Sequence, residues 1–176
     1  MDARAELRRA RVLALVAMAA CVALDQLSKL AARALLDPGR RYSFLGDVFR
    51  LELVRNPGAF LSLGASLPPR IRSAVFTWGV LVLVLGAAWA ALHRPGSRRT
   101  AVAAALVAGG GLGNLWDRLA AHGFVTDFLN LGIGGLRTGV FNVADLAIVG
   151  GALLLLFPAR PRPHGSPGDQ APSAPT

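Results

Sequence analysis

Apolar residues along the chain are gathered into four long runs that are separated by more polar stretches. Each run is close to the roughly 20 residues that a helix needs to cross about 30 Å of hydrocarbon. The pattern therefore predicts an all-α membrane protein with four transmembrane helices. The expected spans are residues 12–33, 71–93, 100–120 and 140–158.

The connection between the first two spans, residues 34–70, has a pattern of its own. Apolar and charged side chains alternate over residues 49–53, and this period of two indicates a half-buried strand. Asn-Pro-Gly at 56–58 is typical of a turn. We therefore expect a small β-rich subdomain on the extracytoplasmic surface of the membrane.

The chain divides into one polytopic membrane domain, residues 1–157, and a tail, residues 158–176. The tail is rich in Pro, Gly and Ser and lacks apolar periodicity, so we expect it to be disordered. Four spans place both termini on one side. The arginines on that side lie in short segments beside the spans, and this density favours a cytoplasmic location for both termini.

Composition supports the membrane interpretation. The chain is 53% hydrophobic and only 16% charged, which is too apolar for an ordinary soluble domain. Its net charge of +9 raises the question of nucleic acid, but the basic residues flank apolar runs and form no binding motif. We expect anionic membrane lipid to be the partner of these residues, and no nucleic acid. Cys21 is the only cysteine, so a disulfide framework is excluded.

The N-terminus also has features of a secretory signal, because a basic segment precedes an apolar one. Residues 18–21, Met-Ala-Ala-Cys, resemble a lipobox, which would make the chain a lipoprotein substrate. The usual Leu three residues before the cysteine is missing, however, and further long apolar runs follow. We therefore interpret the first run as a retained span.

Several polar residues lie inside the spans or at their ends. One charge at membrane depth costs about 2.5–3.5 kcal/mol on insertion scales, so these residues are expected to face one another. Three pairs share a helix face through i, i+3 or i, i+4 spacing. The set comprises Asp25 and Lys29, Asn114 and Arg118, Asn142 and Asp145, together with Asp117. The Asp25–Lys29 pair either only neutralises itself or helps to shape a site.

Gly109 and Gly113 form a GxxxG pattern that favours close helix packing.

Among hydrolytic chemistries, carboxylates are the best candidates. A serine or cysteine nucleophile needs a neighbouring base, but Cys21 lies in mid-span and the histidines are in loops or the tail. A zinc site would need an HExxH or CxxC spacing, and the sequence has neither. Two close carboxylates can share one proton, so that one acts as acid while the other activates water.

Spacing alone does not choose the carboxylate pair. The candidates are Asp25, Asp47, Asp117, Asp127 and Asp145. Asp127 and Asp145 bracket one short external loop, so both can reach the same depth at the membrane surface.

Five sequence blocks carry a resemblance to a known family. They are DQLSK from Asp25, RNPGAF from Arg55, GNLWDR from Gly113, VTDF from Val125 and FNVAD from Phe141. In this order and within four spans, over residues 12–157, the chain resembles lipoprotein signal peptidase, or signal peptidase II, an aspartyl membrane protease of bacteria.

The resemblance implies a function and a set of site residues. Asp127 and Asp145 would be the catalytic pair. The residues that would line or support the site are Asp25, Lys29, Asn56, Gly58, Asn114, Arg118 and Asn142. The implied substrate is a prolipoprotein with diacylglycerol on its lipobox cysteine, cut on the amino side of that cysteine. The implied enzyme needs no metal or organic cofactor. We expect it to be a monomer in the bacterial cytoplasmic (inner) membrane, with its active site near the extracytoplasmic face.

Two stretches depart from the family pattern. Residues 129–140 form a Gly-rich link where the family commonly has a longer segment with a Trp, and Leu146 stands where a Ser is common. The asparagine block reads NPGAF, with one Ala fewer than the commoner pattern. These departures bear on the shape of the substrate cleft.

The alternative class is a non-catalytic four-helix transporter or assembly protein that uses the same buried charges as a relay or as helix glue. It does not explain why the polar residues concentrate towards one side.

Overall fold

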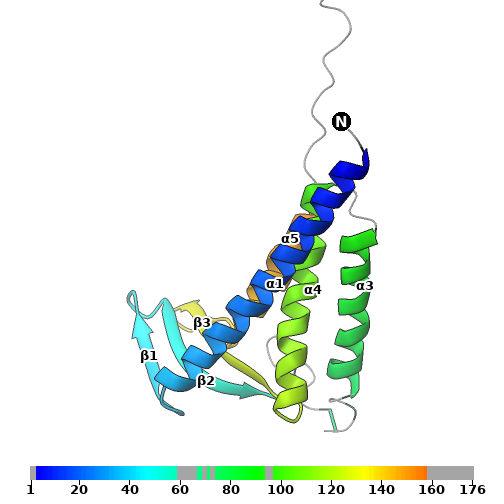
Figure 1. Cartoon of the computed structure of the whole chain (residues 1–176). Helices are drawn as coiled ribbons and strands as arrows, with labels where there is room; N and C mark the ends of the chain where they lie inside the picture. Colours follow the sequence, from blue (N-terminus) through cyan, green and yellow to red (C-terminus); the bar gives the residue numbers. More distant parts are fainter. Residues whose placement is uncertain (1–2, 59–66, 69–70, 72–73, 94–96, 158–176) are drawn as a thin grey trace, which may run out of the picture.

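The computed structural model is mostly helical and carries a small antiparallel sheet, as the sequence predicts (Figure 1). The residues that it describes are 3–58, 67–68, 71, 74–93 and 97–157. The predicted disordered tail and the Ala-Phe end of the RNPGAF block lie outside them. In chain order the elements are α1 (Ala3–Leu35), β1 (Arg41–Phe44), β2 (Phe49–Asn56), η2 (Val75–Gly79), α3 (Val80–His93), α4 (Arg98–Ala120), β3 (Val125–Ile133), β4 (Leu136–Arg137) and α5 (Val143–Leu156).

Helix α4 is the centre of the bundle, and α1, α3 and α5 all pack against it (Figure 1). A run of glycines makes this close packing possible. A Cβ at Gly109 would lie 2.9 Å from the Cβ of Cys21 in α1, and one at Gly110 would collide with the backbone of Ala144 in α5. A Cβ at Gly113 would collide with the carboxylate of Asp25. The GxxxG pattern therefore serves helix packing, as predicted.

The sheet has the order β1-β2-β3-β4, and every neighbouring pair is antiparallel. The predicted strand at 49–53 is confirmed within β2, although its residues are all partly buried and do not alternate in exposure. The sheet is not confined to residues 34–70, because β3 and β4 lie at Val125–Ile133 and Leu136–Arg137, where the sequence analysis predicted no strand. Pairing of β2 with β3 sets Val54 opposite Asp127 and Asn56 opposite Val125.

The span lengths differ from the prediction. Among the described residues, one helix, Arg4–Leu35, is long and apolar enough to cross a membrane, and it starts earlier than the expected span 12–33. The apolar helices Thr77–His93 and Val143–Leu156 are shorter. Their outward faces carry large apolar side chains, among them Val82 and Leu153. The count of four spans therefore stays a prediction.

Candidate active site

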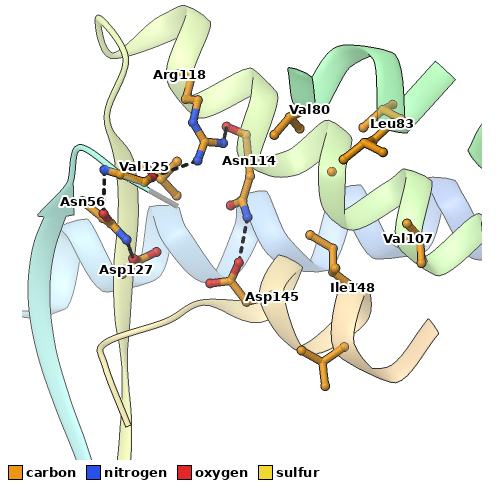
Figure 2. Close-up of a pocket in the computed structure, with 14 residues that line it drawn as sticks. Asn56, Val80, Leu83, Val107, Asn114, Arg118, Val125, Asp127, Asp145 and Ile148 are labelled. Carbon is orange, nitrogen blue, oxygen red and sulfur yellow. Dashed lines mark hydrogen bonds between the residues drawn. The ribbon is translucent and has the colours of Figure 1, made fainter. Parts of the chain in front are cut away.

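A pocket of about 320 Å³ lies where the helices meet the sheet (Figure 2). Its polar lining comes from β2 and the turn after it, α4, β3 and α5: Asn56, Gly58, Asn114, Arg118, Asp127 and Asp145. The rest of the lining is largely apolar: Val80, Leu83 and Val84 from α3, Val107 and Gly111 from α4, Val125 from β3, and Ile148 and Val149 from α5. The pocket thus presents a cluster of hydrogen-bonding groups at one end and an apolar wall at the other.

Asp127 reaches the pocket from β3, and its side chain is only 1% exposed. Both of its carboxylate oxygens accept amide hydrogen bonds. Asn56 Nδ2 donates to Oδ2 over 2.8 Å, and Asn142 Nδ2 donates to Oδ1 over 2.6 Å. Burial raises the pKa of Asp127 to about 7; the nearby charge of Asp145 acts in the same direction, and the two amide donors oppose the shift. The carboxyl group can therefore hold a proton near neutral pH.

Asp145 lies in the first turn of α5, where Asn142 is the N-cap. Asn142 Oδ1 accepts the N–H of Asp145 over 3.0 Å, and Asp145 Oδ2 accepts the N–H of Asn142 over 3.2 Å, which completes a capping box. The same Asn142 side chain donates to Asp127. One asparagine therefore contacts both aspartates and holds them at the same end of the pocket.

Asn114 is the hydrogen-bonding partner of Asp145 on α4. Its Nδ2 donates to Asp145 Oδ1 over 2.9 Å (Figure 2). Its Oδ1 accepts from Lys29 Nζ and from Asn142 Nδ2, each over 3.0 Å. Because Lys29 has only donors to offer, it fixes which way the Asn114 amide faces.

Lys29 is also the centre of a buried ionic cluster behind the pocket. Its Nζ lies 2.8 Å from Asp25 Oδ2 and 3.2 Å from Asp117 Oδ2. Asp25 Oδ1 accepts the backbone N–H of Ala144 over 3.0 Å, and Asp117 Oδ2 accepts the N–H of Thr126 over 2.9 Å.

These two backbone anchors explain what the rival aspartates do. Ala144 immediately precedes Asp145, and Thr126 immediately precedes Asp127. Each rival carboxylate therefore holds the residue next to one pocket aspartate, and Lys29 ties the two carboxylates together. The Asp25–Lys29 pair, whose role the sequence left open, supports the site and does not only neutralise itself.

Arg118 joins α4 to the turn after β2. Its Nη2 donates to the carbonyl of Gly58 over 3.1 Å, and its Nη1 donates to the carbonyl of Asn114 over 3.2 Å. Gly58 in turn donates its N–H to Asn56 Oδ1 over 2.9 Å. The Nε of Arg118 is buried and has no hydrogen-bond partner among the described residues.

All nine residues that the sequence analysis assigned to the site are thus brought together, from α1, β2 and its turn, α4, β3 and the start of α5. Two features were missed. Thr126 carries no signal in the sequence, because its contribution is a backbone N–H. The apolar wall from α3 resembles any other part of an apolar helix. Among the described residues, no group of three or more His, Cys, Asp or Glu side chains is arranged to hold a metal ion.

Comparison with known proteins gives a consistent result. A family model described as signal peptidase (SPase) II matches residues 17–159. The lipoprotein signal peptidase of Rhodococcus jostii is 36% identical over 83% of this chain and 71% of its own length. That of Mycobacterium avium is 37% identical over 85% and 79%, and that of Moorella thermoacetica is 41% identical over 77% and 85%.

Two solved structures, each described as a bacterial membrane enzyme, have the same fold. One matches with a TM-score of 0.70, covering 81% of this chain and 84% of that one. The other has a TM-score of 0.71 and covers 81% and 89%; both are 22% identical to this chain. The matches of the family model and of the curated relatives extend over most of the chain, and the chain therefore belongs to the signal peptidase II family.

Proposed function

We propose that this chain is an aspartic endopeptidase that removes the signal peptide from diacylglyceryl-modified prolipoproteins, cleaving on the amino side of the lipidated cysteine. Its family is one of proteases, and the relatives compared above are lipoprotein signal peptidases. The observation that carries the aspartic mechanism is the pair Asp127 and Asp145, a buried and a half-buried carboxylate that both contact Asn142 at the polar end of an apolar pocket.

The two carboxylates have different surroundings, and these support different roles. Asp127 retains a proton near neutral pH, because burial raises its pKa to about 7. Asp145 lies in the first turn of α5, where the helix dipole favours a negative charge. We therefore assign the acid to Asp127 and the base to Asp145.

In the first step, Asp145 removes a proton from a water molecule while the water oxygen attacks the scissile carbonyl carbon. Asp127 donates its proton to the carbonyl oxygen, which gives a neutral tetrahedral diol. In the second step, Asp127 takes a proton from one hydroxyl as the carbon–nitrogen bond breaks. Asp145 returns its proton to the departing nitrogen. The products are a new carboxylic acid and a free amine, and both aspartates regain their starting protonation.

The remaining lining fits a substrate with apolar and peptide parts. Side chains from α3 and α5 form the apolar wall, which suits the apolar part of a signal peptide or an acyl chain. Arg118 and Asn114 lie at the polar end, where backbone carbonyls of the substrate would need donors. The buried, unpaired Nε of Arg118 is one such donor.

We further propose that the protein resides as a monomer in the bacterial inner membrane, with four spans, cytoplasmic termini and the site at the extracytoplasmic face. The long apolar helix α1 and the apolar outward faces of α3 and α5 support a membrane location. The sheet lies at the end of the bundle away from the N-terminus of α1, which supports the assigned side of the site (Figure 1).

The experiment is to express the wild type, Asp127→Asn and Asp145→Asn in cells depleted of their own enzyme and to follow prolipoprotein processing on gels. Both variants are expected to reach the membrane at wild-type levels and to leave the precursor uncut. Asp37→Asn is the matched control, because Asp37 is an exposed carboxylate outside the pocket. Processing that survives in both pocket variants would refute the dyad.

A further inference from the structure

The sheet has an apolar end that the proposed chemistry does not use. The turn between β1 and β2, residues 45–48, lies beside the Gly134–Gly135 turn between β3 and β4, because Gly132 N–H donates to the carbonyl of Val48 over 2.9 Å. Leu45 in the first turn and Ile133 and Leu136, which flank the second, are 80%, 78% and 85% exposed. We call these three side chains the tip surface. It lies at the opposite end of the β2–β3 pair from Asn56.

A cluster of charged side chains lies close to the tip surface along the chain, because Asp47 is in the first turn and Arg137 follows Leu136. Arg50 forms an ion pair with Asp47, and its Nε donates to Asp47 Oδ1 over 2.5 Å. Arg137 Nη1 donates to the carbonyl of Asp47 over 2.6 Å, and its Nε donates to Asn130 Oδ1 over 2.7 Å. The cluster joins both turns. Two arginines and one aspartate leave it with a net positive charge, which complements an anionic surface.

Large apolar side chains are unusual in tight turns, where Gly, Asn, Asp and Ser dominate. Here Leu45 lies in the first turn, and Ile133 and Leu136 are the strand residues on either side of the second, so that three exposed apolar side chains lie at one end of the sheet. Their position in the molecule indicates what covers them. In Figure 1 the two turns, cyan and yellow, lie level with the lower half of the helices and not beyond the end of the bundle. The helices of the bundle present apolar outward faces, with exposed side chains such as Val82 of α3 and Leu153 of α5.

We propose that the tip surface inserts into the membrane leaflet on the sheet's side, with Leu45, Ile133 and Leu136 among lipid acyl chains. The positively charged cluster then lies at the depth of the lipid phosphates, where arginine is favourable. Insertion stops at the boundary between headgroups and acyl chains, because the turns contain backbone groups that need polar partners. The far end of the sheet is thereby anchored, which fixes the height of β2 and β3 where they line the pocket.

The test measures the depth of the tip in a bilayer. Cys21→Ala removes the only native cysteine, which is buried in α1. Leu45→Cys, Leu136→Cys and Ile133→Cys are then made singly in that background, labelled with a nitroxide and reconstituted into vesicles of phosphatidylcholine and phosphatidylglycerol. Collision rates are recorded with oxygen, which concentrates in hydrocarbon, and with a water-soluble nickel chelate. Arg40→Cys is the matched control, because Arg40 is exposed and lies just before β1, at the other end of the sheet.

At the three tip positions, oxygen is expected to collide with the label several-fold more effectively than nickel, relative to Arg40→Cys. A nickel-accessible label at the tip positions would overturn the proposal, because the tip would then be in water. A label shielded from both reagents would also overturn it, because a second copy or another protein would then cover the tip. The substitutions remove side chains with little intramolecular packing, so the fold should persist. If one of the three cysteine variants does not fold or label, the other two still test the proposal.

Discussion

The strongest quantitative prediction concerns Lys29, which is fully buried with its Nζ shared among Asp25, Asp117 and Asn114. Its three donors match three acceptors at 2.8, 3.2 and 3.0 Å. Lys29→Met keeps most of the side-chain volume and removes the charge. Asp25 and Asp117 are then left buried in the bundle without their common cation.

Removing one partner of a buried ion pair costs about 3–5 kcal/mol. For a chain of this length, each kcal/mol lowers the unfolding temperature by about 2–4 °C. Lys29→Met should therefore lower the unfolding temperature by about 6–20 °C. The assay is thermal unfolding of the detergent-solubilised protein, followed by the fluorescence of its three tryptophans.

The design includes a rescue and a control. The triple variant Asp25→Asn, Lys29→Met, Asp117→Asn removes all three charges, while the asparagine oxygens can still accept the backbone N–H groups of Ala144 and Thr126. It should recover at least half of the lost stability. Arg40→Met breaks an exposed ion pair with Asp37 and should leave the unfolding temperature nearly unchanged. The reasoning is refuted if Lys29→Met unfolds within 2 °C of the wild type, by roughly the scale above, or if the triple variant is as unstable as the single one.

Three further predictions follow from the site and the packing. Cleavage by the wild type should decline as the pH rises through about 7, because Asp127 then loses the proton it donates. In Asn56→Ala the decline should move to higher pH, because the hydrogen bond from the Asn56 amide, which lowers the pKa of Asp127, is lost. An unmoved pH–rate profile in Asn56→Ala would contradict this. Asn142→Ala should lower the rate of cleavage by about 100-fold, the effect expected when a catalytic group is misplaced by about 1 Å, because Asn142 contacts both aspartates. An unchanged rate in single-turnover assays would exclude a positioning role for Asn142. Gly151→Ala should lower the free energy of unfolding by about 1–3 kcal/mol, because the added Cβ would lie 2.6 Å from the carbonyl oxygen of Ala103. Gly150→Ala is the control, because an added Cβ there meets open space. Equal thermal unfolding of the two variants would contradict the packing argument.

Much of the site was predictable because its signals are local. A polar side chain within an apolar membrane segment is costly in free energy unless it has polar partners, so the apolar runs themselves identify site candidates. These are Asp25, Lys29, Asn114 and Asn142. Helical spacing then places partners on one face, as it does for Asn142 and the aspartate that follows it in the capping box. The resemblance to a family added the pair of catalytic candidates, which spacing had left open.

Other features arise from contacts between distant parts of the chain. Strand β3 was missed because its apolar residues do not alternate regularly with polar ones over residues 125–129, and it is a strand by pairing with β2, Phe49–Asn56, far earlier in the chain. The apolar wall of the pocket was missed for a related reason. Val80 and Leu83 look like any lipid-facing residues until α3 packs beside α4.

The sequence by itself predicted the apolar helices and the polar residues buried within them, because periodicity and the cost of burying charge act on neighbouring residues. Only the tertiary structure decided how the five candidate aspartates divide. Asp127 and Asp145 line the pocket, Asp25 and Asp117 each hold the backbone beside one of them, and Asp47 joins two turns of the sheet. That division depends on which atoms of separate elements meet, and spacing along one chain does not contain this information.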